Sequence, residues 1–221
     1  MDQQRVLAWH HFDNAAHNAL APHPFRSDGE KGHGVAAGSG AVQTTHQPAD
    51  PRGEAEAIAR QHTFLILLPL GQIAAGLWEL ARTPNARQYL DNAKWNAHHL
   101  RQPGRFHLGC ILVVLAQIAG GLRADASGAS ADACFHEAAR QANAAGPDIP
   151  AKALRALYYI CLGSLWEVGD ASARQYLENA CWNAHRFQQE GTVSRYGAVR
   201  TVLAQLAGAL KTDISPDQPT A

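Results

Sequence analysis

The chain has 221 residues, of which 17% are charged, and its 19 Lys and Arg balance 19 Asp and Glu to a formal net charge of zero. This length suits one domain with a sizeable hydrophobic core. The balanced charge argues against broad nucleic-acid binding, which needs clustered positive charge, and against attraction to an anionic membrane surface.

In chain order, residues 1–20 show an amphipathic helical pattern, with Val6, Trp9 and Phe12 at helical spacing. Residues 21–53 are rich in Gly and Pro and contain almost no large apolar side chain, which predicts a flexible insertion. Helix signals are dense over residues 54–211, so we expect the helical repeat domain there. Residues 212–221 are polar, contain two prolines and are expected to be disordered.

The repeat domain predicts a series of helices separated by Pro- and Gly-containing turns. Their expected ranges are 54–81, 84–99, 105–122, 130–143, 149–168, 171–189 and 193–210. Pro69 leaves open whether the first is one helix or two with a kink, and Ser130 or Asp132 can cap the fourth. With residues 1–20, the prediction is an all-α fold of about seven or eight helices.

An internal repeat organises these helices. Residues 86–98 return almost unchanged as 173–185, and weaker copies lie at 8–19 and 131–142. In each copy, alanine stands four residues before, three after and seven after one large apolar residue: Phe12, Leu90, Phe135 or Leu177. These offsets share one helix face, on which small residues admit a neighbouring helix and the large one fills the space between them.

A second, leucine-rich helix type follows each copy. Its last leucines recur at spacings of 45, 43 and 45 residues, at Leu77, Leu122, Leu165 and Leu210. Two alternating helix types at a fixed period predict antiparallel helical hairpins in a short array, interrupted by the insertion at 21–53. No helix follows 193–210, so we expect this C-terminal helix to be the contact of a homo-oligomer.

The pattern resembles tetratricopeptide-type helical repeats. Ala86, Leu90 and Ala93 match the second helix of that family's hairpin, and the run 70–77 matches its first helix. The match extends over residues 65–210, but the period is 43–45 residues instead of roughly 34, and the family's tryptophan and glycine–tyrosine signatures are absent. The resemblance implies a right-handed superhelix whose concave face binds a peptide or a partner helix.

Asparagines spaced four apart are the first candidate binding residues. The pairs are Asn92 with Asn96 and Asn179 with Asn183. They can form a ladder of side-chain hydrogen bonds between hairpins, or a row of amides that holds an extended peptide.

Two tryptophans at equivalent positions are the second candidate. Trp95 and Trp182 follow the core leucines by five residues and point away from the alanine face, so we expect them to be partly exposed. They are candidate anchors for a partner, with packing between repeats as the alternative.

Other chemistry is weakly represented. Of the 12 histidines, His98, His99 and His185 are the metal candidates, but no helical pair of ligands appears, and we expect no metal and no cofactor. The chain contains no glycine-rich phosphate loop and no nucleophile–base motif, so we do not expect an enzyme.

Two further features suggest the protein's environment. The first residues include Asp2, Trp9 and two histidines where a secretory signal would be hydrophobic, so a cytoplasmic location is expected. Residues 63–80 are nearly as long and apolar as a membrane span, but they contain Pro69, Gln72 and Glu79, and we expect no membrane association.

The sequence therefore predicts a protein–protein interaction module, such as an adaptor, a chaperone or a regulatory subunit, that binds a peptide or a partner helix. The alternative is a helical bundle that binds a small ligand, a metal or haem without catalysis.

Overall fold

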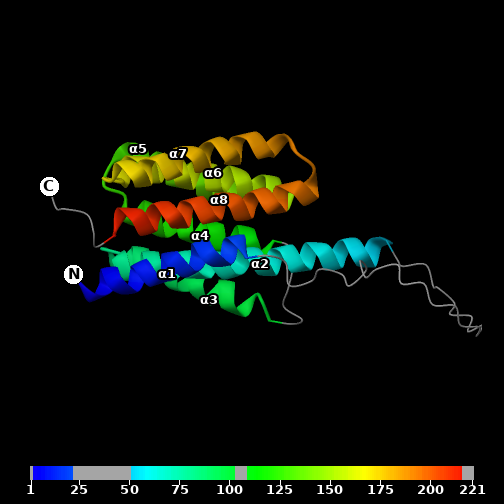
Figure 1. Ribbon diagram of the computed structural model, residues 1–221, viewed down its shortest axis with the longest axis horizontal. Helices are drawn as coiled ribbons and strands as arrows, with labels where there is room; N and C mark the ends of the chain where they lie inside the picture. The colour runs from blue at the N-terminus through cyan, green and yellow to red at the C-terminus, as the bar shows by residue number, and fades with distance from the viewer. Residues whose placement is uncertain (1, 22–50, 103–108, 216–221) are drawn as a thin grey trace, which may run out of the picture.

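The structure is a computed structural model that describes residues 2–21, 51–102 and 109–215, without the side chains of residues 51, 52, 54–56, 58, 59 and 192–194. In these residues it contains helices and no strand, which confirms the all-α prediction (Figure 1). The helices are α1 (Gln3–Leu20), α2 (Pro51–Leu80), α3 (Pro84–His99), α4 (Cys110–Asp125), α5 (Ala129–Ala142), α6 (Ile149–Glu167), α7 (Ala171–Arg186) and α8 (Thr192–Asp213), with a short 3₁₀ turn, η1 (Phe187–Gln189).

The eight helices form a closed ring of two layers. The leucine-rich helices α2, α4, α6 and α8 form the inner layer, in which each contacts the next and α8 contacts α2. The alanine-faced helices form the outer layer: α3, α5 and α7 each lie between two consecutive inner helices, and α1 lies between α8 and α2. The resemblance implied an open superhelix, whereas α1 closes this array on itself.

The closing contact between α8 and α1 repeats a junction found elsewhere in the ring. Lys211 of α8 lies 2.6 Å from Asp13 and 4.5 Å above the ring of Trp9, both on α1. At the equivalent place Arg123 of α4 donates to Asp132 of α5 at 2.9 Å and contacts the neighbouring His136. Helix α1 therefore packs after α8 in the same way as α5 packs after α4.

A buried arginine fastens the same junction. Arg200 of α8 is only 9% exposed, and its guanidinium donates to the carbonyl oxygens of Ala19, at 3.0 Å, and of Ala21. These carbonyls end α1 and have no partner inside the helix. Helix α8 is thus covered by α1, so the premise of the predicted oligomer contact, an uncovered C-terminal helix, does not hold, while the oligomer itself stays a prediction.

The repeated alanine face is buried as predicted. All sixteen residues at the offsets −4, 0, +3 and +7 are at most 4% exposed. In three outer helices, α1, α3 and α5, the large residue packs on the backbone of the inner helix at a glycine. A Cβ at Gly76 would lie 2.4 Å from Phe12, and one at Gly163 would lie 2.5 Å from Phe135. Glycine is required there by the close approach of a rigid aromatic ring.

A pair of glycine substitutions should therefore shift stability in opposite directions. Gly76→Ala should destabilise the fold by about 1–3 kcal/mol, because the new methyl group overlaps Phe12. Gly208→Ala should stabilise it by about 0.5–1 kcal/mol, because its Cβ would lie 3.6 Å from Tyr176, at ordinary contact, while alanine favours helix. Urea unfolding of both variants measures the two effects, and equal signs would contradict this packing.

Several expected boundaries are corrected by the structure. α2 begins at Pro51 and is one helix with Pro69 inside it, and α8 continues to Asp213. The N-cap of α5 is Gly128 without a side-chain bond, instead of Ser130 or Asp132. Residues 22–50 of the expected insertion and residues 216–221 of the expected tail lie outside the described residues.

One stretch within the described residues, Arg60–Leu80, is long and apolar enough to cross a membrane, and 56% of its most apolar window is buried in the fold. It belongs to inner helix α2, which packs against α1, α3, α4 and α8. Burial between four other helices accounts for an apolar composition of this kind.

Candidate functional site

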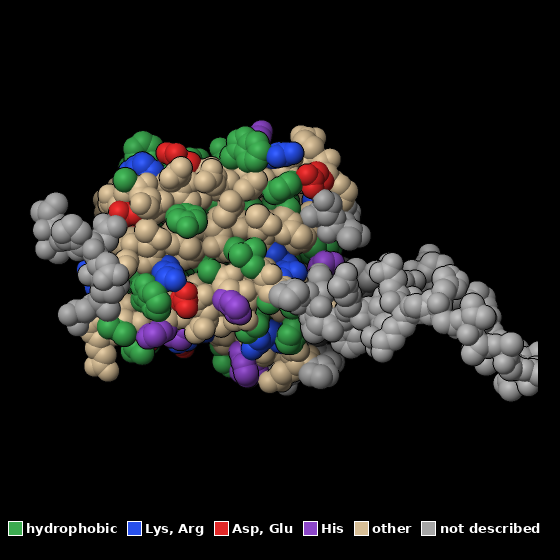
Figure 2. Space-filling view, in the orientation of Figure 1, with side chains coloured by type: hydrophobic (Ala, Val, Ile, Leu, Met, Phe, Trp, Pro, Cys, Tyr) green, Lys and Arg blue, Asp and Glu red, His purple; other side chains and the backbone are tan. Residues whose placement is uncertain are grey.

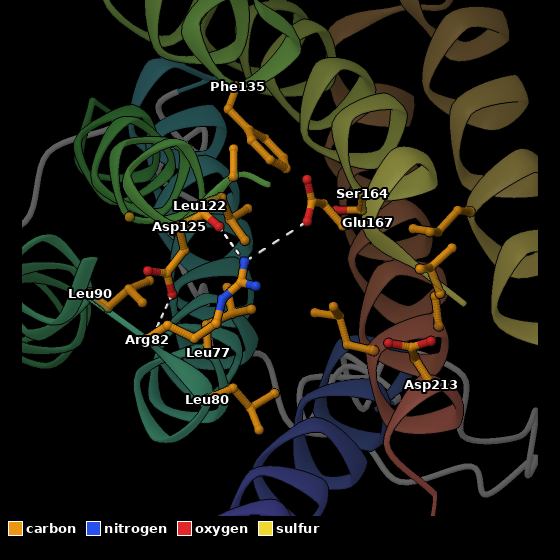
Figure 3. A pocket seen from close by; sticks show the side chains of 16 residues that line it. Leu77, Leu80, Arg82, Leu90, Leu122, Asp125, Phe135, Ser164, Glu167 and Asp213 are labelled. Atoms are coloured by element: carbon orange, nitrogen blue, oxygen red, sulfur yellow. Dashed lines mark hydrogen bonds and ion pairs between the residues drawn. The ribbon is translucent and has the colours of Figure 1, made fainter. Parts of the chain in front are cut away.

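A cavity opens at one end of the ring, where the four inner helices end (Figure 3). Its volume is about 260 Å³. It is lined mainly by apolar side chains from the last turns of the inner helices and by core residues of the outer helices. The main lining side chains are Leu77, Leu80, Leu90, Leu122, Phe135, Val168, Leu177 and Leu210.

One wall of the cavity has a smaller side chain than the other three. The residue after the close-packed glycine or alanine is leucine in three inner helices and serine in α6; these residues are Leu77, Leu122, Leu210 and Ser164. The Ser164 hydroxyl donates to the carbonyl oxygen of Ile160 at 2.9 Å, so its polar atom is satisfied within α6. A fourth leucine is thus absent from this layer of the ring.

Three carboxylates stand at the rim of the cavity and hold the loops of the ring. Asp125 accepts from the backbone amides of Arg82, at 2.7 Å, and Thr83, at 2.9 Å. Glu167 accepts from the amide of Ser127 at 2.9 Å and from its hydroxyl at 2.7 Å. Each acid ends an inner helix and binds the loop that precedes the neighbouring outer helix.

The third carboxylate also holds a loop, but it does so with one oxygen only and has no arginine beside it among the cavity-lining residues. Asp213, at the end of α8, accepts at Oδ1 from the amides of Gly169, at 3.1 Å, and Asp170, at 3.2 Å. Arg82 reaches across the rim to the carbonyl oxygen of Asp125 and lies 4.0 Å from Glu167. Asp213 stands on the opposite side of the cavity from Arg82 (Figure 3).

The comparisons with known proteins do not identify this arrangement. The chain matches no protein-family model, no curated protein and no solved structure.

The structure gives part of the predicted asparagine set a bonding role inside the hairpins. The amide nitrogen of Asn96 donates to Gln117 of α4 at 3.0 Å, and that of Asn183 donates to Gln205 of α8 at 3.0 Å. A third such bond, at 3.1 Å, joins Asn18 to Gln72. These bonds link the two helices of one hairpin and not neighbouring hairpins. Asn92 and Asn179 are exposed.

Both predicted tryptophans are more than half exposed. Trp95 is 54% exposed and Trp182 is 59% exposed, on outer helices α3 and α7. One face of each indole is covered by the residue four positions later. The ring of His99 stacks on Trp95 at 3.9 Å between centroids, and the guanidinium of Arg186 lies 4.9 Å from the Trp182 ring. The two sites therefore share position, exposure and local support.

The metal candidates do not come together. His98 and His99 are on α3, His185 is on α7, and these helices do not touch each other in the described part of the chain. The same residues contain no group of three or more His, Cys, Asp or Glu arranged to hold a metal.

Two cysteine thiols form a pair between α6 and α7. Interaction with the Cys181 thiol, together with burial, raises the pKa of Cys161 well above its usual value, and the same interaction lowers the pKa of Cys181. The Cys181 thiol lies 3.8 Å from the carbonyl oxygen of Tyr158, to which it donates. The four cysteines are free, and Cys110 and Cys161 are buried.

Sequence reasoning missed the cavity. Its rim acids come at the ends of predicted helices and its walls come from residues already counted as core. The repeat period put Leu165 at the leucine position of α6, and only the packing of Gly163 against Phe135 shows that Ser164 occupies it.

Proposed function

We propose that this protein is a protein–protein interaction module that binds its partner through the outer face of the ring. The observation that carries the proposal is the exposure of Trp95 and Trp182 at equivalent positions. Tryptophan is usually largely buried in a monomer and is enriched at the energetic centres of interfaces.

The surroundings of the two indoles support this proposal. Because His99 and Arg186 each cover one face of an indole, the tryptophans are held in fixed orientations before any partner arrives. A side chain ordered in advance loses less entropy on binding. Asn92 and Asn179 stand three residues before the tryptophans, on the same helix faces, and add exposed hydrogen-bonding groups.

The ring geometry bears on the kind of partner. α3 lies between α2 and α4, and α7 lies between α6 and α8, so the two tryptophans are on opposite sides of the ring. Apolar side chains on the face in Figure 2 form separate spots among polar groups, without one broad patch. This arrangement favours two small anchor sites, each taking one partner segment, over a single large interface.

The proposal takes from the resemblance to tetratricopeptide repeats only the way in which neighbouring helices pack. The eight consecutively packed helices are compatible with a helical repeat, and a small-residue helix face that receives a neighbouring helix is common to both. Because the described helices close into a ring instead of an open superhelix, we place binding on the outer helices. A cytoplasmic location belongs to the same proposal.

Site-specific cross-linking tests this function. A photo-reactive amino acid placed at Asn92 or Asn179 should cross-link one protein in the source cells, because both positions border an exposed indole. The double variant Trp95→Ala and Trp182→Ala should reduce recovery of that protein at least tenfold. Trp166→Ala is the matched control, because Trp166 is 65% exposed but does not occupy the repeated position.

Retention of the partner by the double variant, or its equal loss with Trp166→Ala, would contradict the assignment of the site. Absence of any cross-linked protein at both positions would contradict the function.

A further inference from the structure

The cavity at the end of the ring has a chemical character separate from the outer-face sites. Its walls are leucine, valine and phenylalanine side chains, which favour an apolar group. Its volume of about 260 Å³ is larger than the roughly 150 Å³ that holds benzene in a protein core. It is smaller than the roughly 300 Å³ at which drug-sized pockets begin. A ligand of one aromatic ring with a short substituent fits this size.

The electrostatic field at the mouth is negative because acidic side chains outnumber basic ones there. The lining contains three carboxylates, Asp125, Glu167 and Asp213, against one arginine, Arg82. A cationic group is therefore stabilised here, and an anionic group is repelled.

One carboxylate is placed to receive such a group. Arg82 lies beside Asp125 and Glu167 and offsets their charge. Asp213 is on the other side of the cavity, and its hydrogen bonds within the described residues all use Oδ1 to hold the loop before α7. Its second oxygen is available to accept from a ligand, next to the apolar wall made by Leu210 and Val168.

We propose that this cavity binds a small organic ammonium ion, an aromatic or branched aliphatic group of about one ring carrying a protonated amine. The apolar group occupies the space beside Ser164, where the fourth leucine is absent. The ammonium group lies at the mouth and donates to Asp213.

Calorimetric titration of the full chain with a matched pair of probes tests this proposal. 2-Phenylethylammonium and 2-phenylethanol have nearly the same shape and differ in charge. The ammonium ion should bind at least tenfold more tightly than the alcohol, and the difference should shrink as salt is added.

Three variants locate the binding. Asp213→Asn keeps an oxygen for the loop amides but removes the charge, and should lower the affinity for the ammonium ion at least tenfold with little change for the alcohol. Ser164→Leu fills the cavity and should weaken both probes. Glu178→Gln removes the same charge from an exposed site on α7 that does not line the cavity, and should change neither.

Equal affinity for the two probes, no binding of the ammonium ion, or binding that survives both Asp213→Asn and Ser164→Leu would each overturn the proposal. Melting curves of the variants separate loss of binding from loss of fold. Since the outer-face tryptophans are not involved, their removal should leave this binding unchanged.

Discussion

Phe12→Ala is expected to lower the free energy of unfolding by about 3–5 kcal/mol. The Phe12 ring is fully buried and lies against the backbone of α2 at Gly76. No side chain at Gly76 can move into the space that the ring leaves, so the cavity persists and its full cost is retained. Urea unfolding measures the change.

The same substitution should release α1 before the rest of the ring. The connection from α1 to α2, from Leu20 to Pro51, is much longer than the loops on either side of α5, so α1 can leave without displacing another outer helix, and hydrogen exchange of its amides should accelerate most. Phe135→Ala is the matched control, because it removes the equivalent ring from α5, which short loops join to α4 and α6. Equal exchange profiles in the two variants would contradict this account of α1.

A double substitution isolates the contact between ring and glycine. In the Phe12→Ala background, Gly76→Ala should become stabilising, because the overlapping ring is gone and alanine favours helix. A loss of stability equal to that in the parent protein would show that the ring is not what excludes a side chain at Gly76.

Arg200→Ala is expected to cost about 3 kcal/mol. The guanidinium donates to two carbonyl oxygens at the end of α1, and hydrogen bonds that involve a charged group each contribute roughly 1.5–3 kcal/mol. Burial lowers the pKa of Arg200 from its usual value, because removing the guanidinium from water disfavours its charged form. The two hydrogen bonds offset this desolvation. Thermal and urea unfolding measure the loss.

Two further variants define what Arg200 contributes. Arg200→Lys should recover part of the loss, because Lys152 of α6 already donates to two carbonyl oxygens in the loop after α5, those of Ala144 and Gly146. Arg155→Ala, at an exposed position of α6, should change stability by less than about 0.5 kcal/mol. Full recovery of stability by lysine would mean that the positive charge alone, and not the paired hydrogen bonds of the guanidinium, holds α1 in place.

The repeat explains which parts of the fold were predictable. The alanine offsets are local in sequence, and the burial of Ala86, Leu90 and Ala93 follows from helix geometry alone. Closure of the ring depends on contacts almost 200 residues apart, such as Lys211 with Asp13, which no local period encodes. One sequence clue was available. Arg123 of α4 and Asp132 of α5 stand at the positions that Lys211 and Trp9 occupy on α8 and α1, which are the same two helix types.

The candidate sites also divide into those that local helix geometry predicts and those that depend on tertiary packing. Exposure of Trp95 and Trp182 was predictable, because five residues after a core leucine is the opposite side of a helix. The hydrogen bond of Asn96 to Gln117 was not, because it depends on how deeply α3 sits beside α4. The cavity was not predictable either, since it arises where four helix ends meet in space.

The closing helix has a consequence for how copies of the chain meet. Residues 22–50 join α1 to α2 and number 29, so at full extension they could reach about 100 Å. A second copy offers an identical seat between its own α8 and α2. Exchange of α1 between two copies would therefore create a dimer without any new interface, in which every contact described above is kept. Protein concentration, and not surface chemistry, would set the balance between closed monomers and exchanged dimers.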